Sequence, residues 1–511
     1  MTWIDLLDWL AERHGDATAL SDDRGGRVSY AELARRSTEI AGGLRDLGVG
    51  PGDTVALVDH NSVDFFLVVF GAARLRAIPA LVNWRLTPVE IESVYAVADP
   101  VAVAAGTGLV AGLPDDLPDI RIVLGPAAEA PAGWRPLAGV GGVWPPDAPR
   151  PDSADPFVLG FSSGTTGRPK GGPMRHRALI RSVYVDAQDI AGMYPGARQA
   201  MVAPTFHLAG LLNSLFGLTN GAHVHQMDGF DPIRMLEYIE QEKVNYTTVV
   251  PTMFRMIVEA ARTAGRSFDL SSVEEMSYGA SPIAPELVRE VMALFPGARL
   301  RQFYGMTEVA GALTVLHPDD HSPDGPHLGS AGQVNAGFRV RLVDPEGNDV
   351  PDGEPGVLLT RSESLMPGYW NDPAATATAI VDGWFNTGDI AIRDNGYLTI
   401  MDRAKDMIVT GGENVYPAEV EATLYEHDEV ADVAVIGVPD EKLGERVHAL
   451  VVATSPNFTG DELMAWTTGR LAGFKRPRSV ELVTGLPRNA SGKLLKRELR
   501  APHWEGHDRV I

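Results

Sequence analysis

Apolar and polar positions follow two periods along the first part of the chain. Short apolar runs, typical of buried strands, occur at residues 53–58, 78–82 and 101–105. Helical spacing occupies residues 3–13, 30–47 and 63–74. Two capping boxes, Ser29 with Glu32 and Thr87 with Glu90, mark helix starts. Strands that alternate with helices predict an α/β fold with a parallel sheet covered on both faces.

The alternation continues beyond a Pro-, Gly- and Ala-rich connection at residues 125–151. Further strands are expected at residues 200–203, 222–226, 246–250, 273–278 and 300–303. Helices between them include residues 211–218 and one from Pro232 to about Glu242. The pattern therefore predicts a second α/β layer built like the first.

From about Gly329 the pattern becomes rich in strands, with residues 338–343 and 356–360 on either side of a turn sequence. Beyond Asp402 it indicates a compact unit: helices at 417–427, 461–471 and 494–499, and strands at 430–436 and 447–453. We therefore predict two domains, a large body (residues 1–402) and a small, mobile α+β lid (residues 403–511), with a hinge near Lys405.

Composition narrows the class of protein. The 511 residues are 44% hydrophobic and 22% charged, which is typical of a globular protein with more than one core. A net charge of −23 argues against sequence-independent binding to nucleic acid, which requires cations that neutralise phosphates. The chain has no cysteine, so it has neither disulfides nor thiolate chemistry. We see no apolar run of about 18 residues and no signal peptide, and we expect a cytoplasmic protein without a membrane span.

The most informative stretch is LGFSSGTTGRPKGG, residues 159–172, which follows an apolar strand. Glycine lets backbone N–H groups turn toward an anion, and hydroxyls and a lysine add donors, so this loop suits a polyphosphate. The spacing is not that of a Walker A loop. A solvated surface turn is the alternative. The candidate ligands are Ser162, Ser163, Gly164, Thr165, Thr166 and Lys170.

Polar and small residues also follow several predicted strands, where ligands of parallel sheets bind. His207 ends one strand, Tyr278-Gly279-Ala280-Ser281 another, and Gln302-Phe303-Tyr304-Gly305-Met306-Thr307-Glu308 a third. Small residues admit a flat ring, Thr307 can donate to a phosphate, and Glu308 can hold Mg²⁺. Asp389, in WFNTGD, can accept from two ribose hydroxyls. Each segment alone also fits an ordinary turn or helix start.

Taken together, SSGTTGRPKG, PTFH, YGMTE, WFNTGD and the final GK resemble the adenylate-forming enzymes, which comprise acyl- and aryl-CoA ligases, luciferases and peptide-synthetase adenylation domains. The resemblance covers nearly the whole chain, with the segments in the family's order. It implies a body that binds AMP and the acyl group, with Lys493, Thr307, Glu308 and His207 as catalytic residues. It implies Mg²⁺ at Thr165 and Glu308, and an acyl pocket lined by His207, Tyr278, Gly279 and Gly305.

For ATP, the resemblance implies contacts from the phosphate-loop residues, from Gly279, Ala280, Ser281, Gln302, Tyr304, Gly305 and Thr307, and from Asp389, Arg403 and Lys493. Lys405 is implied as the hinge. For CoA it implies Gly411, Gly412, Phe474, Arg476 and Arg478. One departure follows the loop: Gly171-Gly172-Pro173 replaces the family's usual GV continuation, and it could alter loop closure.

The resemblance implies an ATP-dependent acid–CoA ligase that forms an acyl adenylate with release of pyrophosphate, and then a thioester. ATP, Mg²⁺ and CoA are the expected cofactors and a small carboxylic acid the expected partner. Alternatives are an adenylating enzyme that serves a carrier protein or an amine, or that activates an unusual acid such as nitrite, and a regulator without catalysis. The acid (fatty, aryl or cinnamoyl-like) stays open, as does the oligomeric state, for which a homodimer is one option.

Overall fold

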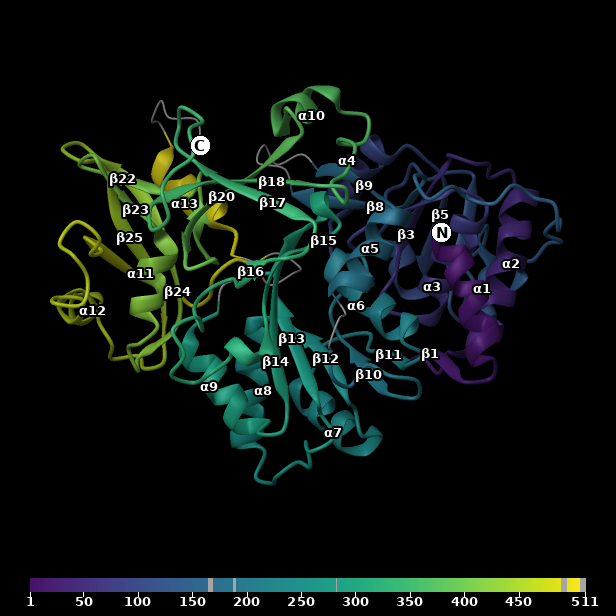
Figure 1. The fold of residues 1–511 in the computed structure, drawn as a ribbon, viewed down its shortest axis with the longest axis horizontal. Helices are drawn as coiled ribbons and strands as arrows, with labels where there is room; N and C mark the ends of the chain where they lie inside the picture. Colours follow the sequence, from purple (N-terminus) through teal and green to yellow (C-terminus); the bar gives the residue numbers. More distant parts are fainter. Residues whose placement is uncertain (164–168, 187–189, 282, 489–493, 506–511) are drawn as a thin grey trace.

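A computed structural model describes residues 1–163, 169–186, 190–281, 283–488 and 494–505. Its strands form three sheets, two in the large body and one in the lid (Figure 1). No helix within the described ranges combines the length and the apolar character needed to cross a bilayer.

The first sheet has the strand order β7-β6-β5-β3-β4-β8-β9. Its strands are β3 (Thr54–Val58), β4 (Ile78–Leu81), β5 (Pro100–Gly106), β6 (Ile120–Leu124), β7 (Arg135–Pro136), β8 (Pro156–Ser163) and β9 (Pro169–Arg175). All neighbours are parallel except the hairpin of β8 and β9. Side chains of β3 alternate between two cores: Val55 and Leu57 belong to one, Ala56 and Val58 to the other. The sheet is therefore covered on both faces, as predicted.

Helices from the amino-terminal part of the chain cover this sheet (Figure 1). They are α1 (Trp3–His14), α2 (Tyr30–Asp46), α3 (Val63–Arg74) and α4 (Pro88–Ala98). The predicted capping boxes are present at Ser29 and Thr87, where each hydroxyl accepts the N–H of the residue three positions on. Helix α3 contributes buried residues to the first of the two cores, and α4 to the second.

The second sheet runs from the parallel strands of the body into the strand-rich segment without a break. Its order is β17-β18-β20-β21-β16-β15-β14-β13-β12-β10-β11-β1-β2, with β19 beside β20. Pairing is parallel from β1 through β11, β10 and β12 to β14, and antiparallel from β14 to β21. The strand-rich segment is thus an extension of the second layer.

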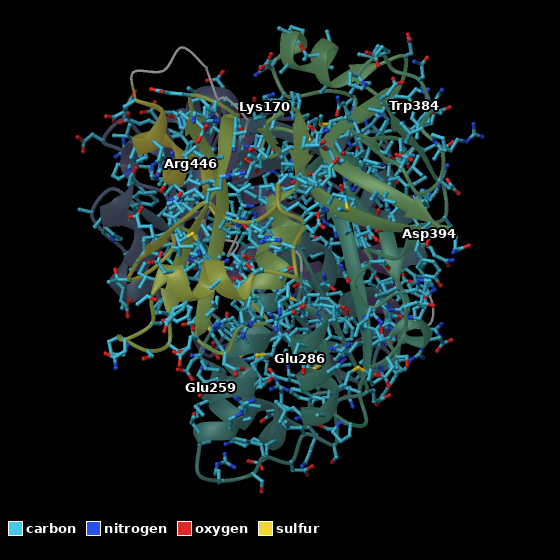
Figure 2. All side chains as sticks on the ribbon, turned by 90° about the vertical axis from the view of Figure 1, so that its left-hand side faces the viewer. Lys170, Glu259, Glu286, Trp384, Asp394 and Arg446 are labelled. Carbon is cyan, nitrogen blue, oxygen red and sulfur yellow. The ribbon has the colours of Figure 1, made fainter. Side chains whose placement is uncertain are left out.

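Strands of the second sheet are β1 (Thr18–Asp22), β2 (Arg27–Ser29), β10 (Arg198–Met201), β11 (His223–Gln226), β12 (Tyr246–Val249), β13 (Glu275–Gly279), β14 (Arg299–Met306), β15 (Gly311–Leu316), β16 (Gln333–Val334), β17 (Phe338–Val343), β18 (Pro355–Ser362), β19 (Ile380–Val381), β20 (Trp384–Asp394) and β21 (Tyr397–Arg403). The helices that accompany it are α5 (His176–Asp186), α6 (Leu208–Thr219), α7 (Pro232–Glu242), α8 (Pro251–Thr263), α9 (Pro285–Leu294) and α10 (Pro373–Ala379). Glu259 on α8 and Glu286 on α9 are exposed at the outer surface (Figure 2).

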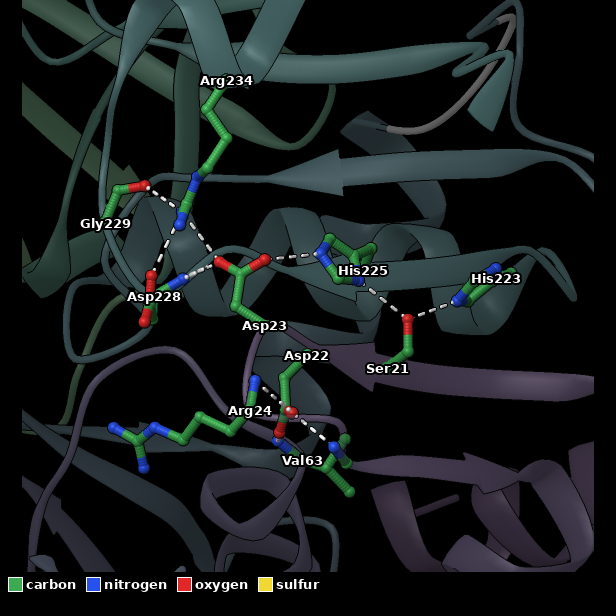
Figure 3. A network of polar contacts seen from close by, with 11 residues as sticks. Ser21, Asp22, Asp23, Arg24, Val63, His223, His225, Asp228, Gly229 and Arg234 are labelled. Carbon is green, nitrogen blue, oxygen red and sulfur yellow. Dashed lines mark hydrogen bonds and ion pairs between the residues drawn. The ribbon is translucent and has the colours of Figure 1, made fainter. Parts of the chain in front are cut away.

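A side-chain network fastens the amino-terminal strand β1 to β11 (Figure 3). The Ser21 hydroxyl lies 2.7 Å from His223 Nε2 and 2.8 Å from His225 Nδ1. The Asp23 carboxylate lies 3.1 Å from His225 Nε2 and also contacts Arg234. Burial favours the protonated acid, but the hydrogen bond from His225 and the charge of Arg234 outweigh it and lower the pKa of Asp23 to about 2.

The lid sheet has the order β23-β22-β25-β24, with β26 on β25. Its strands are β22 (Ile408–Thr410), β23 (Glu413–Val415), β24 (Val430–Asp440), β25 (Gly444–Ala453) and β26 (Ser479–Leu482), and its helices α11 (Pro417–Leu424), α12 (Gly460–Trp466) and α13 (Lys496–Trp504). Helices α11 and α12 end earlier than the periodicity predicts, because α11 is followed by a turn and the residues after α12 form a turn and an isolated bridge between Thr468 and Leu471.

Candidate active site

The hairpin of β8 and β9 brings the ends of the glycine-rich stretch together. Ser162 and Lys170 are partners in its register, so both belong to strands and not to the loop that we predicted. Ser163 is the last residue of β8. Gly164, Thr165 and Thr166 lie outside the described residues. The antiparallel pairing explains the difference, because it extends the strand one residue beyond the first hydroxyl of the stretch.

Glu308 joins this hairpin to the segment that follows β14. It is 8% exposed, and its Oε1 accepts hydrogen bonds from Ser162 Oγ at 3.0 Å and from the Tyr369 hydroxyl at 3.1 Å. Lys170 Nζ lies 4.8 Å from the centre of the Tyr369 ring, in cation–π geometry. Burial, together with the Glu308 charge, raises the pKa of Tyr369. A carboxylate, two hydroxyls and an ammonium therefore converge, and the carboxylate suits Mg²⁺ by its oxygen chemistry.

Thr307, beside Glu308, lies against two glycines of the hairpin. A Cβ at Gly160 or Gly172 would stand 3.1 or 3.2 Å from Thr307 Cγ2. The Gly171 carbonyl accepts the Trp370 N–H at 2.7 Å. The Gly171-Gly172 departure thus permits close approach of Thr307 and Trp370 to β9.

A second polar cluster surrounds Asp389 on β20. Its carboxylate lies 2.6 Å from Arg403 Nε and accepts the Tyr304 hydroxyl. Asp389 is 3% exposed, and Arg403 is its partner across β20 and β21. Burial, and then the charge of Asp389, raises the pKa of Tyr304. Asp389 and Arg403, the predicted ribose ligands, thus lie on the paired strands β20 and β21. The sequence WFNTGD, taken alone, suggests a turn.

The predicted adenine and acyl segments lie at the carboxyl ends of parallel strands β13 and β14. A Cβ at Gly279 would stand 2.2 Å from the Phe303 carbonyl oxygen, and one at Gly305 2.0 Å from that of Gly311, so both positions require glycine. Ala280 has φ +68°. Ser281 follows it and is half-buried.

Two side chains hold buried polar atoms that lack a partner within the described part of the chain: Gln302 Oε1 on β14 and His207 Nε2. Contrary to our prediction, His207 does not end a strand, because β10 stops at Met201 and His207 is the N-cap of α6. Burial, and secondarily the Arg85 charge, lowers the pKa of His207 to about 4, so the imidazole is neutral at pH 7. Tyr278 is 1% exposed and its hydroxyl lies 2.9 Å from His321 Nε2. A ligand could supply the hydrogen bonds that Gln302 Oε1 and His207 Nε2 lack among the described residues.

The connection to the lid is anchored by charges. Asp402 Oδ2 accepts the Ala418 N–H at the start of α11, at 2.9 Å, and lies 3.8 Å from Lys496 Nζ. Lys496 Nζ also lies 2.8 Å from Glu421 Oε1. Lys405, the predicted hinge, is exposed, and its carbonyl accepts from Arg500 at 3.2 Å.

The predicted CoA residues lie on two separate segments of the lid. Gly411 and Gly412, with φ +62° and +86°, form the two-residue turn of the β22–β23 hairpin, a conformation that itself favours glycine. Arg476 donates to the Leu471 carbonyl and to Thr468. Phe474 and Arg478 are exposed. Lys493 lies outside the described residues.

Comparisons with known proteins agree with this arrangement. The AMP-binding enzyme family matches residues 7–370, and its C-terminal domain matches residues 419–493. The chain belongs to the AMP-binding enzyme family. Within it, the chain is an enzyme of the AMP-forming CoA ligase type, for which acid, ATP, Mg²⁺ and CoA are typical reactants.

The chain is 39% identical over 497 residues to a feruloyl-CoA synthase of an Amycolatopsis species, covering 96% of this chain and 95% of the relative. It is 34% identical to the fatty acid–[acyl-carrier-protein] ligase ScoC of Streptomyces coeruleorubidus, covering 95% and 94%. Among solved structures, an anthranilate CoA ligase, AuaEII, in complex with anthranoyl-AMP superposes with a TM-score of 0.89 at 25% identity, covering 98% and 97%. These AMP-binding enzymes are similar to the chain over nearly its full length.

Sequence reasoning missed Tyr369 and Lys496. Tyr369 stands on an irregular segment before α10, where no periodicity marks it. Lys496 lies in a basic run, LLKRELR, which is typical of a solvated helix, and only the tertiary packing shows that its ammonium is buried against Glu421.

Proposed function

We propose that this AMP-binding enzyme is an acid–CoA ligase that adenylates an aryl carboxylic acid with ATP and then transfers the acyl group to the thiol of CoA. The observation that carries the proposal is that one short segment serves both polar clusters. Tyr304 donates to Asp389, and Glu308, four residues later, accepts from Ser162. A nucleotide whose ribose meets Asp389 would bring its phosphates toward Ser162 and Lys170.

In the first half-reaction the acid's carboxylate oxygen attacks the α-phosphorus of ATP, and the bond to the β-phosphate oxygen breaks. Asp389 and Arg403 would hold the ribose, and Ser162, Lys170 and Thr307 the phosphates. Glu308 would hold Mg²⁺, which supplies charge neutralisation when bound. Lys493 would stabilise the negative charge that develops. Catalysis is then mainly positioning and electrostatic stabilisation.

In the second half-reaction the thiol sulfur attacks the acyl carbonyl carbon, and AMP leaves. We propose that the lid (residues 403–511) turns about Lys405 between the two steps, so that Gly411 and Gly412 replace Lys493 beside the body. The exposure of Lys405 supports a hinge there, because exposed backbone can change φ and ψ at little cost. In this proposal Phe474, Arg476 and Arg478 meet the CoA nucleotide.

The proposed acid is an aryl acid of the hydroxycinnamate kind. Support comes from the feruloyl-CoA synthase relative and from the aromatic side chains near the strand ends. Phe254 and Tyr278 lie 5.6 Å apart, and Phe206 and His207 4.6 Å apart, between ring centroids. His207, which is neutral at pH 7, has a ring nitrogen with no hydrogen-bond partner among the described residues, and this nitrogen can bond a polar substituent of the substrate ring.

The test is pyrophosphate release from ATP over a panel of hydroxycinnamic, benzoic, indole and fatty acids, with mass spectrometry of products in the presence of CoA. We expect acid-dependent release and a CoA thioester with hydroxycinnamic acids. Absence of pyrophosphate with every acid would contradict adenylation. Preference for fatty acids would contradict only the aryl assignment.

A carrier-protein thiol is the second candidate acceptor, because a relative of similar length is a ligase for acyl-carrier protein. Pyrophosphate release that continues without a CoA thioester, together with acylation of a phosphopantetheinylated carrier protein, would favour it. The two acceptors carry the same thiol arm, so the first half-reaction does not distinguish them.

A further inference from the structure

Two histidines and a glutamate from three elements of the lid meet at one point. They are His448 on β25, Glu481 on β26 and His503 on α13. One ring nitrogen or carboxylate oxygen of each lies within 4.8 Å of those of the other two. None of the three is assigned to ATP, to the acid or to CoA.

The fold of the lid explains why these side chains meet. Strands β25 and β26 are parallel, and His448 is paired with Ser479. Glu481 is two residues beyond Ser479, so it projects from the same face. Helix α13 packs on β24, and Trp504 Nε1 donates to the Gly437 carbonyl at 3.0 Å, which fixes the end of the helix beside that face.

His448 has the hydrogen-bonding pattern of a metal ligand. Its Nδ1 lies 2.8 Å from Ser479 Oγ, and Nδ1–H donating to that hydroxyl leaves a lone pair on Nε2. The residue is 6% exposed, and Nε2 is buried with no hydrogen-bond partner among the described residues. A buried nitrogen without a partner is costly, and an ion would satisfy it.

The spacing also fits an ion. His448 Nε2 and Glu481 Oε2 are 3.6 Å apart, which is beyond a hydrogen bond. Two ligands at about 2.0–2.1 Å from a tetrahedral Zn²⁺ would be about 3.3 Å apart. The His503 ring centroid lies 5.0 Å from that of His448. The Glu481 side chain is 52% exposed, so an ion can enter and keep water in its fourth position.

We propose that His448, Glu481 and His503 form a binding site for a divalent transition-metal ion, with Zn²⁺ as the ion that best suits two imidazoles and a carboxylate. The ion ties α13 to β25 and β26. Helix α13 begins three residues after Lys493, so the ion stabilises the part of the lid that follows the proposed catalytic lysine.

The experiment is titration of the full-length, chelator-treated protein with ZnCl₂ by calorimetry, together with thermal unfolding. We expect one Zn²⁺ ion to bind per protein chain, and the midpoint temperature of unfolding to rise with the Zn²⁺ concentration. Glu481→Gln and His503→Asn, which change partly exposed side chains, should abolish that site. Ser479→Ala should weaken it by about 10- to 100-fold, because it removes the bond that orients His448.

The control is Glu426→Gln, which changes an exposed carboxylate of the same lid and should bind Zn²⁺ as the unchanged protein does. Circular dichroism of each variant without metal shows whether the lid is folded. If the folded Glu481→Gln and His503→Asn variants bind Zn²⁺ as the control does, or if the unchanged protein binds none, the proposal is wrong.

Discussion

Asp389 and Arg403 face each other across β20 and β21, with 2.6 Å between Oδ1 and Nε. The residue before Arg403 is Asp402, whose carboxylate accepts the first free N–H of α11 in the lid. Arg403 of the proposed ribose site and Asp402, which anchors the lid, are thus adjacent residues of β21. A shift of that strand would reach both, which gives a physical route by which nucleotide occupancy and lid position can influence each other.

We predict that Asp389→Asn lowers kcat/KM for ATP by about 10- to 150-fold, because hydrogen bonds to a charged group contribute about 1.5–3 kcal/mol. The measurement is acid-dependent pyrophosphate release at varied ATP. The matched control is Asp394→Asn at the exposed end of the same strand (Figure 2), which should change little. Equal loss in both variants would mean that the effect comes from the strand and not from the ribose pair.

The Tyr369 side chain makes two interactions that two substitutions can test separately: its hydroxyl donates to Glu308, and its ring contacts Lys170. Tyr369→Phe removes the hydroxyl that donates to Glu308 but keeps the ring beneath Lys170. We expect about a tenfold fall in the rate of pyrophosphate formation, corresponding to about 1.5 kcal/mol. Tyr369→Ala should lose more, because the cation–π contact disappears as well. If the two variants are equally slow, the ring has no role in holding Lys170.

Much of the architecture was predictable because its elements are local. The capping boxes at Ser29 and Thr87 and the apolar helix α3 (Val63–Arg74) appear as the periodicity predicts. The path of the second sheet was not predictable. β1 pairs with β11 about 200 residues away, through Leu20 and Val224, and no local pattern specifies such a partner.

The candidate site was likewise predictable from the sequence only in part. The family resemblance of the motifs implied that Ser162, Glu308 and Asp389 serve one site, and the structure brings Ser162 to Glu308 and Asp389 to Tyr304. The partners that hold them, such as Tyr369, carry no sequence signal, because their role comes from packing. The predicted contacts of Gly164, Thr165, Thr166 and Lys493 stay predictions.

Lys496 is expected to support the lid. Burial disfavours its charge, but the carboxylates of Glu421 and Asp402 outweigh burial and raise its pKa. Lys496→Met would leave these two carboxylates buried without a cation, at a cost of about 3–5 kcal/mol in the free energy of unfolding of the lid. The measurement is denaturant unfolding compared with the exposed Lys442→Met. A loss below about 1 kcal/mol, as for a surface pair, would contradict it.

The last prediction concerns stability at acid pH. His176 is 1% exposed, and its Nδ1 accepts the Trp3 N–H at 3.1 Å, next to the start of α1. Burial lowers its pKa to about 4, from about 6.5 in an unfolded chain.

Because the folded pKa of His176 lies below the unfolded one, the unfolded state binds the proton more tightly. The contribution of His176 is fully present above about pH 6.5 and is lost as the pH falls toward 4, by up to about 3 kcal/mol. His176→Asn keeps an acceptor near Trp3 without a titrating group. We therefore expect its midpoint temperature to fall less than that of the unchanged protein between pH 7 and pH 4.5. Parallel decreases for the two proteins would assign the acid sensitivity to other groups, such as His223, whose pKa burial also lowers to about 4.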